Sequence, residues 1–409
     1  MIAALGLALA SQFAALFIAW PSQDLDRTRA PSLLLFHIGL GCAAVFLVIA
    51  LFSRSAPLRG AAFAAIIVVF LCLGAWMVHA SPQPHIDVWL FERDAARELL
   101  SGRNPYAMTF PDIYHSTLPG YPQEVYGKGL VVNDRCQFGF PYPPVTLLMT
   151  TLGYLAAGDP RYAQVFALAI AGVFIGFSGR RRIATLAIAL LLFTPRVFFV
   201  LGRAWTEPFA VMLLAATVFC AVRRSKWLPI ALGLFLATKQ YLILAVPFTF
   251  FLLPVGWRWR DWIALLVKSA AVAAIVTLPF AIWNFAAFWK SIVTVQRIAP
   301  FRWDALSFIV WWGFHGHGDQ VKLPNYAVLP AAVASLIALA LALWRSPRTP
   351  AGFAASLALL SLAFFAFNKQ AFCNYYFFVI GALCCAIAAS AQDHFTSIAE
   401  CRKPPSLAQ

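Results

Sequence analysis

The sequence predicts an all-α protein, a bundle of about 11–13 membrane-spanning helices with two large polar loops on one side. Of its 409 residues, 62% are hydrophobic and only 11% are charged, with a mean hydropathy of +0.77. Apolar runs of ~20 residues recur along almost the whole chain, and a run of that length crosses the hydrocarbon core of a bilayer. No polar interval is long enough for a separate soluble domain, so we expect a single integral-membrane domain over residues 1–409.

The apolar runs set the expected spans. They lie at about 2–20, 31–51, 61–78, 183–200, 206–222, 261–283, 326–344 and 351–367, followed by a last helix after the polar turn NKQAFCNYY. Residues 1–20 lack the basic start of a signal peptide and are therefore taken as a first helix.

Two intervals are less regular. The segment 144–157 starts after two prolines and is too short for a comfortable span. It is therefore expected to be re-entrant or interfacial, or to form one half of a long broken helix whose other half is 161–178. The segments 228–238 and 241–255 are also short, and they form a hairpin with Lys239 and Gln240 at its tip.

The net charge of +15 has a simple explanation in a membrane protein. Basic residues concentrate in short loops near residues 54–59, 180–182, 223–226, 258–260, 345–348 and 402–403. Such loops face the cytoplasm and its anionic lipids, so the charge does not indicate nucleic-acid binding. We therefore expect a multi-pass protein of the cytoplasmic membrane with both termini inside, and with loops 81–142 and 284–325 on the outer side.

The first polar loop, residues 81–142, carries the strongest candidate for chemistry. It opens with HIDVWLFERDAARELLSGRNPY, and seven of the chain's 16 acidic residues lie between Asp87 and Asp134. Asp87 comes first, at the mouth of the bundle, where a carboxylate can serve as a general base. Alternatively, Asp87 caps a helix that begins at Val88. Asp94 shares its helical face and either serves the same site or pairs with Arg97, whereas Glu92 and Glu98 are expected to be solvated.

Cations at helix ends are the candidate phosphate contacts. Lys239 with Gln240, Arg203 and Lys369 all lie near the outer membrane face, where the alternative is snorkelling to lipid headgroups. Glu207, in RAWTEPF, is a helix cap, a partner for Arg203 or a sugar contact. His85, two residues before Asp87, either binds substrate or is simply solvated.

Three stretches carry a family resemblance. They are Asp87 with the following aromatic residues and AARELLSGRNPY, then Tyr142-Pro143-Pro144 before VTLLMTTLGYL, and LGLFLATKQYLILAVPF around Lys239. In this order they resemble the C-type-fold glycosyltransferases that use polyprenyl-phosphate sugars, most closely the bacterial polyprenol-phosphate-mannose-dependent mannosyltransferases. The likeness covers roughly residues 80–250.

The resemblance implies a membrane enzyme that transfers a sugar, mannose by default, from polyprenyl phosphate to a lipid or glycan acceptor. It implies Asp87 as the base of an inverting transfer, and His85, Asp94, Arg203, Glu207, Lys239, Gln240 and Lys369 as substrate contacts. No nucleotide-binding fingerprint is present, which fits a lipid-borne donor. No cofactor and no metal site are expected, because His315, His317 and Asp319 alone make a weak metal motif.

The competing interpretation is a transporter or a flippase for lipid-linked sugars. Such proteins usually contain internal repeats and place charged residues at the membrane midplane. The sequence shows no convincing repeat, and its polar residues gather in the outer loops and turns.

Overall fold

The computed structural model describes residues 2–114, 125–179, 181–300, 302, 304–317 and 328–401, except for the side chains of 313–317 and 391–401. The chain begins with α1 (Ile2–Ile18), α2 (Leu34–Phe52), α3 (Ala56–Ala80) and α4 (Asp87–Leu100). The middle contains α5 (Pro144–Ala157), α6 (Arg161–Phe177), α7 (Arg181–Leu192), α8 (Val197–Gly202), α9 (Glu207–Val222), α10 (Leu228–Leu236), the 3₁₀ segment η1 (Gln240–Leu252) and α11 (Trp259–Trp283). The last part contains α12 (Phe285–Trp289), the π-helical turn η2 (Lys290–Thr294), α13 (Val295–Ile298), α14 (Phe308–His317), α15 (Leu329–Arg345), α16 (Pro350–Ala366) and α17 (Cys373–Cys401).

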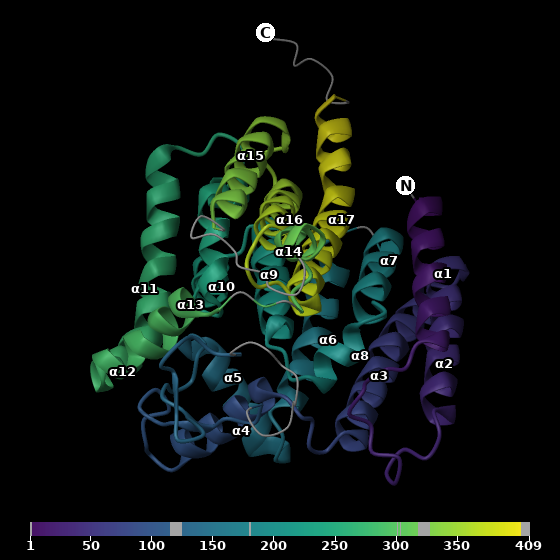
Figure 1. The fold of residues 1–409 in the computed structure, drawn as a ribbon. Coiled ribbons are helices and arrows are strands. Elements are labelled where there is room, and N and C mark those ends of the chain that lie inside the picture. Colours follow the sequence, from purple (N-terminus) through teal and green to yellow (C-terminus); the bar gives the residue numbers. More distant parts are fainter. Residues whose placement is uncertain are drawn as a thin grey trace.

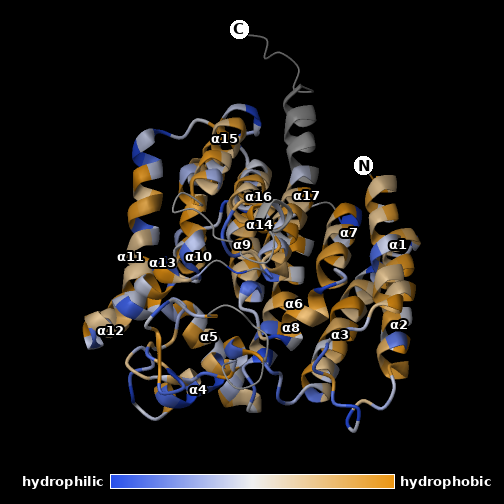
Figure 2. Cartoon of the chain, viewed as in Figure 1, coloured by the Kyte–Doolittle hydropathy of each residue, from blue (hydrophilic) through white to orange (hydrophobic). Residues whose placement is uncertain are grey.

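The predicted helical class is confirmed, and the apolar helices lie side by side in a bundle (Figure 1). Figure 2 shows that hydrophobic residues cover these helices along most of their length, whereas polar residues gather at their ends. Within the described residues, four helices are long and apolar enough to cross a membrane: α2, α3, α11 and the Cys373–Ser390 part of α17. Five shorter apolar helices accompany them: α1, α9, η1, α15 and α16. The total of 11–13 spans stays a prediction.

The irregular interval after Tyr142 is a bent helix pair. α5 and α6 meet at 111°, across the short break that contains Asp159. Pro144 occupies the first turn of α5, where its missing N–H costs nothing, and Gly158 ends the helix in the left-handed conformation at φ 75°. The expected span at 183–200 is likewise divided, into α7 and α8. The break between α5 and α6 lies against the first polar loop, where Trp89 Nε1 donates to Asp159 Oδ2 at 3.3 Å.

The first polar loop folds against one end of the bundle, with α4 and α5 at the end opposite the last turns of α17 (Figure 1). It contains a small antiparallel sheet that the sequence did not indicate, in the order β1 (Phe110–Pro111), β3 (Arg135–Cys136), β2 (Val131–Val132). Phe110 pairs with Cys136, and Cys136 with Val131.

The loop has an apolar core of its own, separate from that of the bundle. Phe91, Tyr106, Phe138 and Phe140 pack there with Phe280, Phe288 and Ile292 from α11, α12 and η2. Each buried aromatic side chain contributes on the order of 2 kcal/mol to stability. Together they keep the loop folded against the bundle instead of extended in solvent.

A buried polar network fastens α4 to the bundle. Glu92 is fully buried and accepts from Gln164 Nε2 at 3.1 and 2.9 Å, and the same nitrogen donates to the Ala204 carbonyl at 3.0 Å. The expectation that Glu92 is solvated is therefore wrong. The reason is that α5 and α6 cover the face of α4 that carries this side chain, and burial raises the pKa of Glu92 well above its usual value.

The second polar loop, residues 284–325, is held by the turn between α16 and α17. Lys369 Nζ donates to the carbonyls of Arg297 and Ala299 at 3.2 and 2.5 Å, and Gln370 Nε2 donates to that of Pro300 at 2.7 Å. Backbone bonds from Arg302 N to Lys369 O (3.2 Å) and from Leu306 N to Ala371 O (2.6 Å) complete this contact, which we call the carbonyl clasp.

Candidate active site

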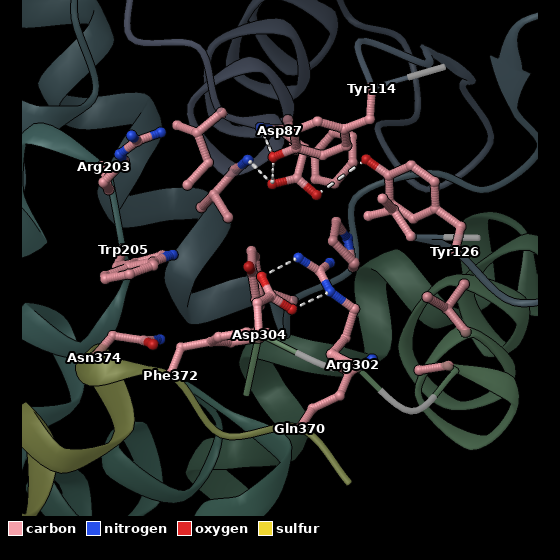
Figure 3. A pocket seen from close by; sticks show the side chains of 18 of the residues that line it. Asp87, Tyr114, Tyr126, Arg203, Trp205, Arg302, Asp304, Gln370, Phe372 and Asn374 are labelled. Atoms are coloured by element: carbon pink, nitrogen blue, oxygen red, sulfur yellow. Dashed lines mark hydrogen bonds and ion pairs between the residues drawn. The ribbon is translucent and has the colours of Figure 1, made fainter. Parts of the chain in front are cut away.

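A cavity of about 680 Å³ lies where the two polar loops meet the bundle. Its wall is formed by six parts of the chain: the loop between α1 and α2, the first polar loop, the turn between α8 and α9, the turn between α10 and η1, the second polar loop and the turn between α16 and α17. The polar and aromatic side chains among the lining residues are Gln23, Asp24, His85, Asp87, Phe91, Tyr114, Tyr126, Phe138, Tyr142, Phe199, Arg203, Trp205, Lys239, Gln296, Arg302, Asp304, Gln370, Phe372, Asn374 and Tyr375. Figure 3 shows ten of the lining residues labelled around the open centre.

Asp87 is held by neutral donors. Its Oδ1 accepts from the Tyr114 hydroxyl at 3.1 Å and from the Val88 backbone N–H at 2.8 Å, and its Oδ2 accepts from the Tyr126 hydroxyl at 3.0 Å. Ile86 occupies the N-cap position of α4 and Asp87 is the first residue of the helix, so Asp87 is not the N-cap residue. Burial raises the pKa of Asp87, although the bond from Tyr126, the charge of Arg302 and the bond from Tyr114 oppose this shift. A carboxylate with a raised pKa is a stronger base, as general-base catalysis requires.

Each of the three described cations in the wall is paired with an acid. Lys239 Nζ lies 2.7 Å from Glu207 Oε1, and Arg203 Nε lies 3.1 Å from Asp24 Oδ2. Arg302 binds Asp304 through two contacts of 2.8 Å each. Figure 3 draws this last pair on the opposite side of the cavity from Asp87.

The Lys239–Glu207 pair is almost completely buried, with 5% and 0% of the two side chains exposed. The ammonium also lies 4.7 Å from the centre of the Tyr142 ring, and 5.9 Å from the rings of Tyr241 and Tyr375. Burying a cation is tolerated only with such compensation. The Oε2 of Glu207 has no hydrogen-bond partner in the described part of the chain.

Lys239 also borders a second depression, which we call the apolar groove. It has a volume of about 420 Å³ and runs between α10, η1, α11 and η2. Its other lining residues are mostly apolar: Pro143, Leu236, Ala237, Gln240, Ile243, Ala273, Ala274, Thr277, Leu278, Phe288 and Ile292. One cation thus adjoins both a polar cavity and an apolar groove.

Four of the eight residues that the sequence singled out line the cavity: Asp87, His85, Arg203 and Lys239. His85 is exposed, and its backbone carbonyl accepts from Arg203 at 3.0 Å. Glu207 is absent from the lining and pairs with Lys239, so of the three alternatives for Glu207 the partnership with Arg203 is wrong. Ala204 adopts a left-handed conformation between them, and the chain turns Arg203 toward Asp24 instead.

The other three lie outside the lining. Asp94 binds Arg93 at 2.8 Å and approaches Arg97 at 3.7 Å, which is the alternative that the sequence left open. Gln240 donates to the carbonyls of Pro141 and Ile292 at 2.9 and 3.2 Å, and so ties the first polar loop to η2.

Lys369 belongs to the carbonyl clasp. Its half-buried ammonium donates hydrogen bonds to backbone carbonyls, and burial lowers the pKa of Lys369. Gln370 and Phe372, which follow it, reach the cavity instead.

Several lining residues were not anticipated from the sequence. Tyr114 and Tyr126 come from a loop without periodicity, and no local pattern marks either as a partner of Asp87. Arg302 and Asp304, separated by one residue in an aromatic-rich stretch, resemble any solvated pair. Gln370, Phe372 and Asn374, by contrast, lie in the turn NKQAFCNYY, which drew notice because it contains Lys369.

No cluster of three or more His, Cys, Asp or Glu that could hold a metal ion occurs among the residues that the structure describes. The His315, His317 and Asp319 motif falls on side chains outside that set.

Comparison with known proteins identifies the fold. No protein-family model and no curated protein matches the sequence. Among solved structures, the chain is similar to ArnT from Cupriavidus metallidurans, crystallised with undecaprenyl phosphate, at a TM-score of 0.50 and 17% identity. The match covers 85% of this chain and 64% of that one. The protein described here therefore has the C-type glycosyltransferase membrane fold that ArnT represents.

Proposed function

We propose that this protein is a membrane glycosyltransferase that takes a sugar, mannose in the first instance, from a polyprenyl-phosphate donor. The observation that carries the proposal is the position of Lys239, where the polar cavity that holds Asp87 meets the apolar groove. A lipid-linked sugar has the same sequence of parts: an apolar chain, an anionic phosphate and a polar ring. The ArnT structure contains undecaprenyl phosphate, a lipid of this type.

The reaction follows from the charges of the cavity. The acceptor hydroxyl gives its proton to Asp87 while its oxygen attacks the anomeric carbon. The bond from that carbon to the phosphate oxygen breaks, and the polyprenyl phosphate leaves with the bonding electron pair. Negative charge then accumulates on the phosphate, where Lys239, Arg203 and Arg302 can neutralise it.

An inverting course is part of the proposal. A retaining enzyme needs a carboxylate nucleophile beside a second acid, whereas inversion needs one base facing the leaving group. Of the three described aspartates in the wall, Asp24 and Asp304 are each paired with an arginine. Asp87, held by hydroxyl and amide donors, is the carboxylate suited to remove a proton. The acceptor in this proposal is a lipid or glycan hydroxyl on the outer face of the cytoplasmic membrane.

The decisive experiment uses the purified chain in proteoliposomes with polyprenyl-phosphate mannose radiolabelled in the sugar, together with a membrane lipid extract. Transfer of label to an acceptor, with release of polyprenyl phosphate, is the expected result. Movement of intact lipid-linked sugar across the bilayer, without cleavage of the sugar–phosphate bond, would instead establish a flippase.

Orientation has its own test. Lys128 lies exposed in the first polar loop, and Lys226 lies exposed between α9 and α10. In intact cells a membrane-impermeant maleimide should label Lys128→Cys above the background of the parent chain, but label Lys226→Cys only after permeabilisation. The reverse pattern would place the cavity on the cytoplasmic side and contradict an outer-face reaction.

A further inference from the structure

One part of the cavity wall plays no role in the proposed chemistry. Asn374, in the first turn of α17, is 4% exposed and lines the cavity, yet its Oδ1 is buried and has no hydrogen-bond partner among the residues that the structure describes. Buried polar atoms are paired in the great majority of cases, and leaving one unpaired costs about 1–3 kcal/mol. The oxygen therefore indicates a hydrogen-bond donor that a ligand supplies.

Trp205 lies in the same wall and is positioned by a strained turn. At the end of α8, Ala204 N donates to Leu201 O and Trp205 N to Val200 O, both at 3.1 Å, with Ala204 in the left-handed region at φ 53°. This is the Schellman arrangement, which normally uses glycine. An alanine there is strained, and strain of this kind gathers at functional sites.

Two contacts hold the strained turn. Gln164 Nε2 donates to the Ala204 carbonyl at 3.0 Å, and the fully buried Ala204 packs in a small cluster with Ile86, Val88 and Trp89 of the α4 entrance. The structure thus fixes Trp205 relative to the helix that carries Asp87. Figure 3 shows the Trp205 indole and the Asn374 amide both directed toward the centre of the cavity.

The chemistry of the unpaired atom selects the part of the substrate that it binds. A carbonyl oxygen accepts hydrogen bonds and repels a phosphate oxygen, so the phosphate does not fit. A prenyl chain has no donor to offer. Of the three parts of a lipid-linked sugar, only the ring carries hydroxyl donors.

We propose that Asn374 and Trp205 form the subsite for the sugar ring, in which Asn374 Oδ1 accepts a ring hydroxyl and the indole packs beside the ring. This inference rests on the proposed function and adds a way for the protein to select the sugar of its donor. A site built around a buried hydrogen-bonding group rejects ligands that lack the matching hydroxyl far more strongly than an apolar pocket does.

The test compares two lipids on the purified full-length chain. Wild-type protein should bind a short-chain polyprenyl-phosphate mannose more tightly than the same lipid phosphate without sugar, by isothermal titration calorimetry. Asn374→Ala should weaken binding of the sugar-bearing lipid by about tenfold, the scale of one hydrogen bond to a buried group, and leave the bare lipid phosphate within about twofold. Alanine favours helix more than asparagine does, so a loss would not reflect a weakened α17.

Asn368→Ala is the matched control. Asn368 belongs to the same turn, but its Oδ1 accepts from Lys369 N at 2.7 Å and it lies outside the cavity lining. It should leave the preference for the sugar-bearing lipid unchanged. An Asn374→Ala protein that keeps the wild-type preference would overturn the subsite while leaving the transfer reaction intact.

A second measurement separates the subsite from the reaction. Saturation-transfer NMR with a panel of methyl glycosides reads ring binding without any transfer. Signal that Asn374→Ala abolishes supports the subsite even where wild-type protein transfers no sugar, a result that would defeat only the proposed function. Absence of glycoside signal from wild-type protein, together with equal affinity for the two lipids, would overturn the subsite.

Discussion

Asp87 and the cations that share its cavity are held by different kinds of partner. The carboxylate accepts from the Tyr114 and Tyr126 hydroxyls and from a backbone amide, all neutral groups. Lys239 and Arg302, by contrast, are each bound directly to a carboxylate.

The difference determines what each side of the cavity can do. Neutral donors stabilise Asp87 without cancelling its charge, so the carboxylate keeps the capacity to take a proton. The cations are compensated before any ligand arrives, which keeps the cost of burying them tolerable. A phosphate must therefore share each cation with an acid already in place, and it gains most when negative charge increases on it during the reaction.

The largest effect should come from Asp87→Asn, which retains the size of the side chain and removes its basicity. If Asp87 is the base, turnover in the radiolabelled transfer assay should fall by on the order of 10²-fold or more. Donor affinity should survive, since the cations that we propose to hold the phosphate are unchanged.

Asp94→Asn provides the comparison on the same helix. Asp94 binds Arg93 and Arg97 outside the lining, and such a partly exposed pair contributes well under about 1 kcal/mol. Its loss should leave turnover within about twofold. Full turnover in Asp87→Asn would show that Asp87 is not the base. The difference between its neutral partners and the charged partners of the cations would then have no catalytic meaning.

The second effect concerns the buried pair of Lys239 and Glu207. Lys239→Ala alone leaves the Glu207 carboxylate buried without its cation, which costs about 3–5 kcal/mol of folding free energy. A loss of activity in that variant could then result from unfolding rather than from a lost phosphate contact. The structure therefore favours Lys239→Met combined with Glu207→Gln, which removes both charges and keeps their volumes.

The double variant should melt close to wild type in a thermal unfolding assay. It should bind bare polyprenyl phosphate about tenfold more weakly or worse, because a charge-assisted hydrogen bond contributes about 1.5–3 kcal/mol. Unchanged affinity for the lipid phosphate would mean that Lys239 serves only to neutralise Glu207.

The smallest expected effect is a shift in the pH dependence of turnover. Asp87 must be ionised to act as a base, so activity falls as pH drops through its pKa, which burial raises above the ordinary 3.8. Tyr126→Phe removes the strongest opposing interaction, so the pKa should rise further and the acidic limb of kcat against pH should move to higher pH. Arg302→Gln should move it in the same direction.

Tyr154→Phe is the control, since Tyr154 accepts from exposed Arg97 at 2.7 Å and lies away from Asp87. Its acidic limb should coincide with that of wild type. A Tyr126→Phe limb at lower pH would show that the hydroxyl does not stabilise the ionised acid.

The fold was predictable because its signal is carried by many residues at once. Runs such as 351–367 and 261–283 differ from α16 and α11 by no more than two residues at either end. The broken segments α5, α6 and η1 were also visible, because Pro144 and the shortness of each run interrupt the pattern.

The site was predictable only in part. Asp87 and Lys239 are marked locally, one by its place after an apolar run and the other by charge within one. Ion pairs are harder to predict, because they depend on how distant turns meet. For Glu207 the sequence offered Arg203, four residues away, as one possible partner, whereas the fold pairs it with Lys239. Glu92 was taken as solvated because nothing on α4 itself reveals that α5 and α6 cover it.

The carbonyl clasp has a consequence for which substitutions this chain can accept. Its acceptors in the second polar loop are the main-chain oxygens of Arg297, Ala299 and Pro300, so the clasp depends on Lys369 and Gln370 but not on the side chains opposite them. Mutations in residues 297–300 can therefore change what the loop presents to the cavity while its anchorage persists. Single substitutions at Ala299 or Pro300 can thus reshape the cavity wall without a compensating change elsewhere in the chain.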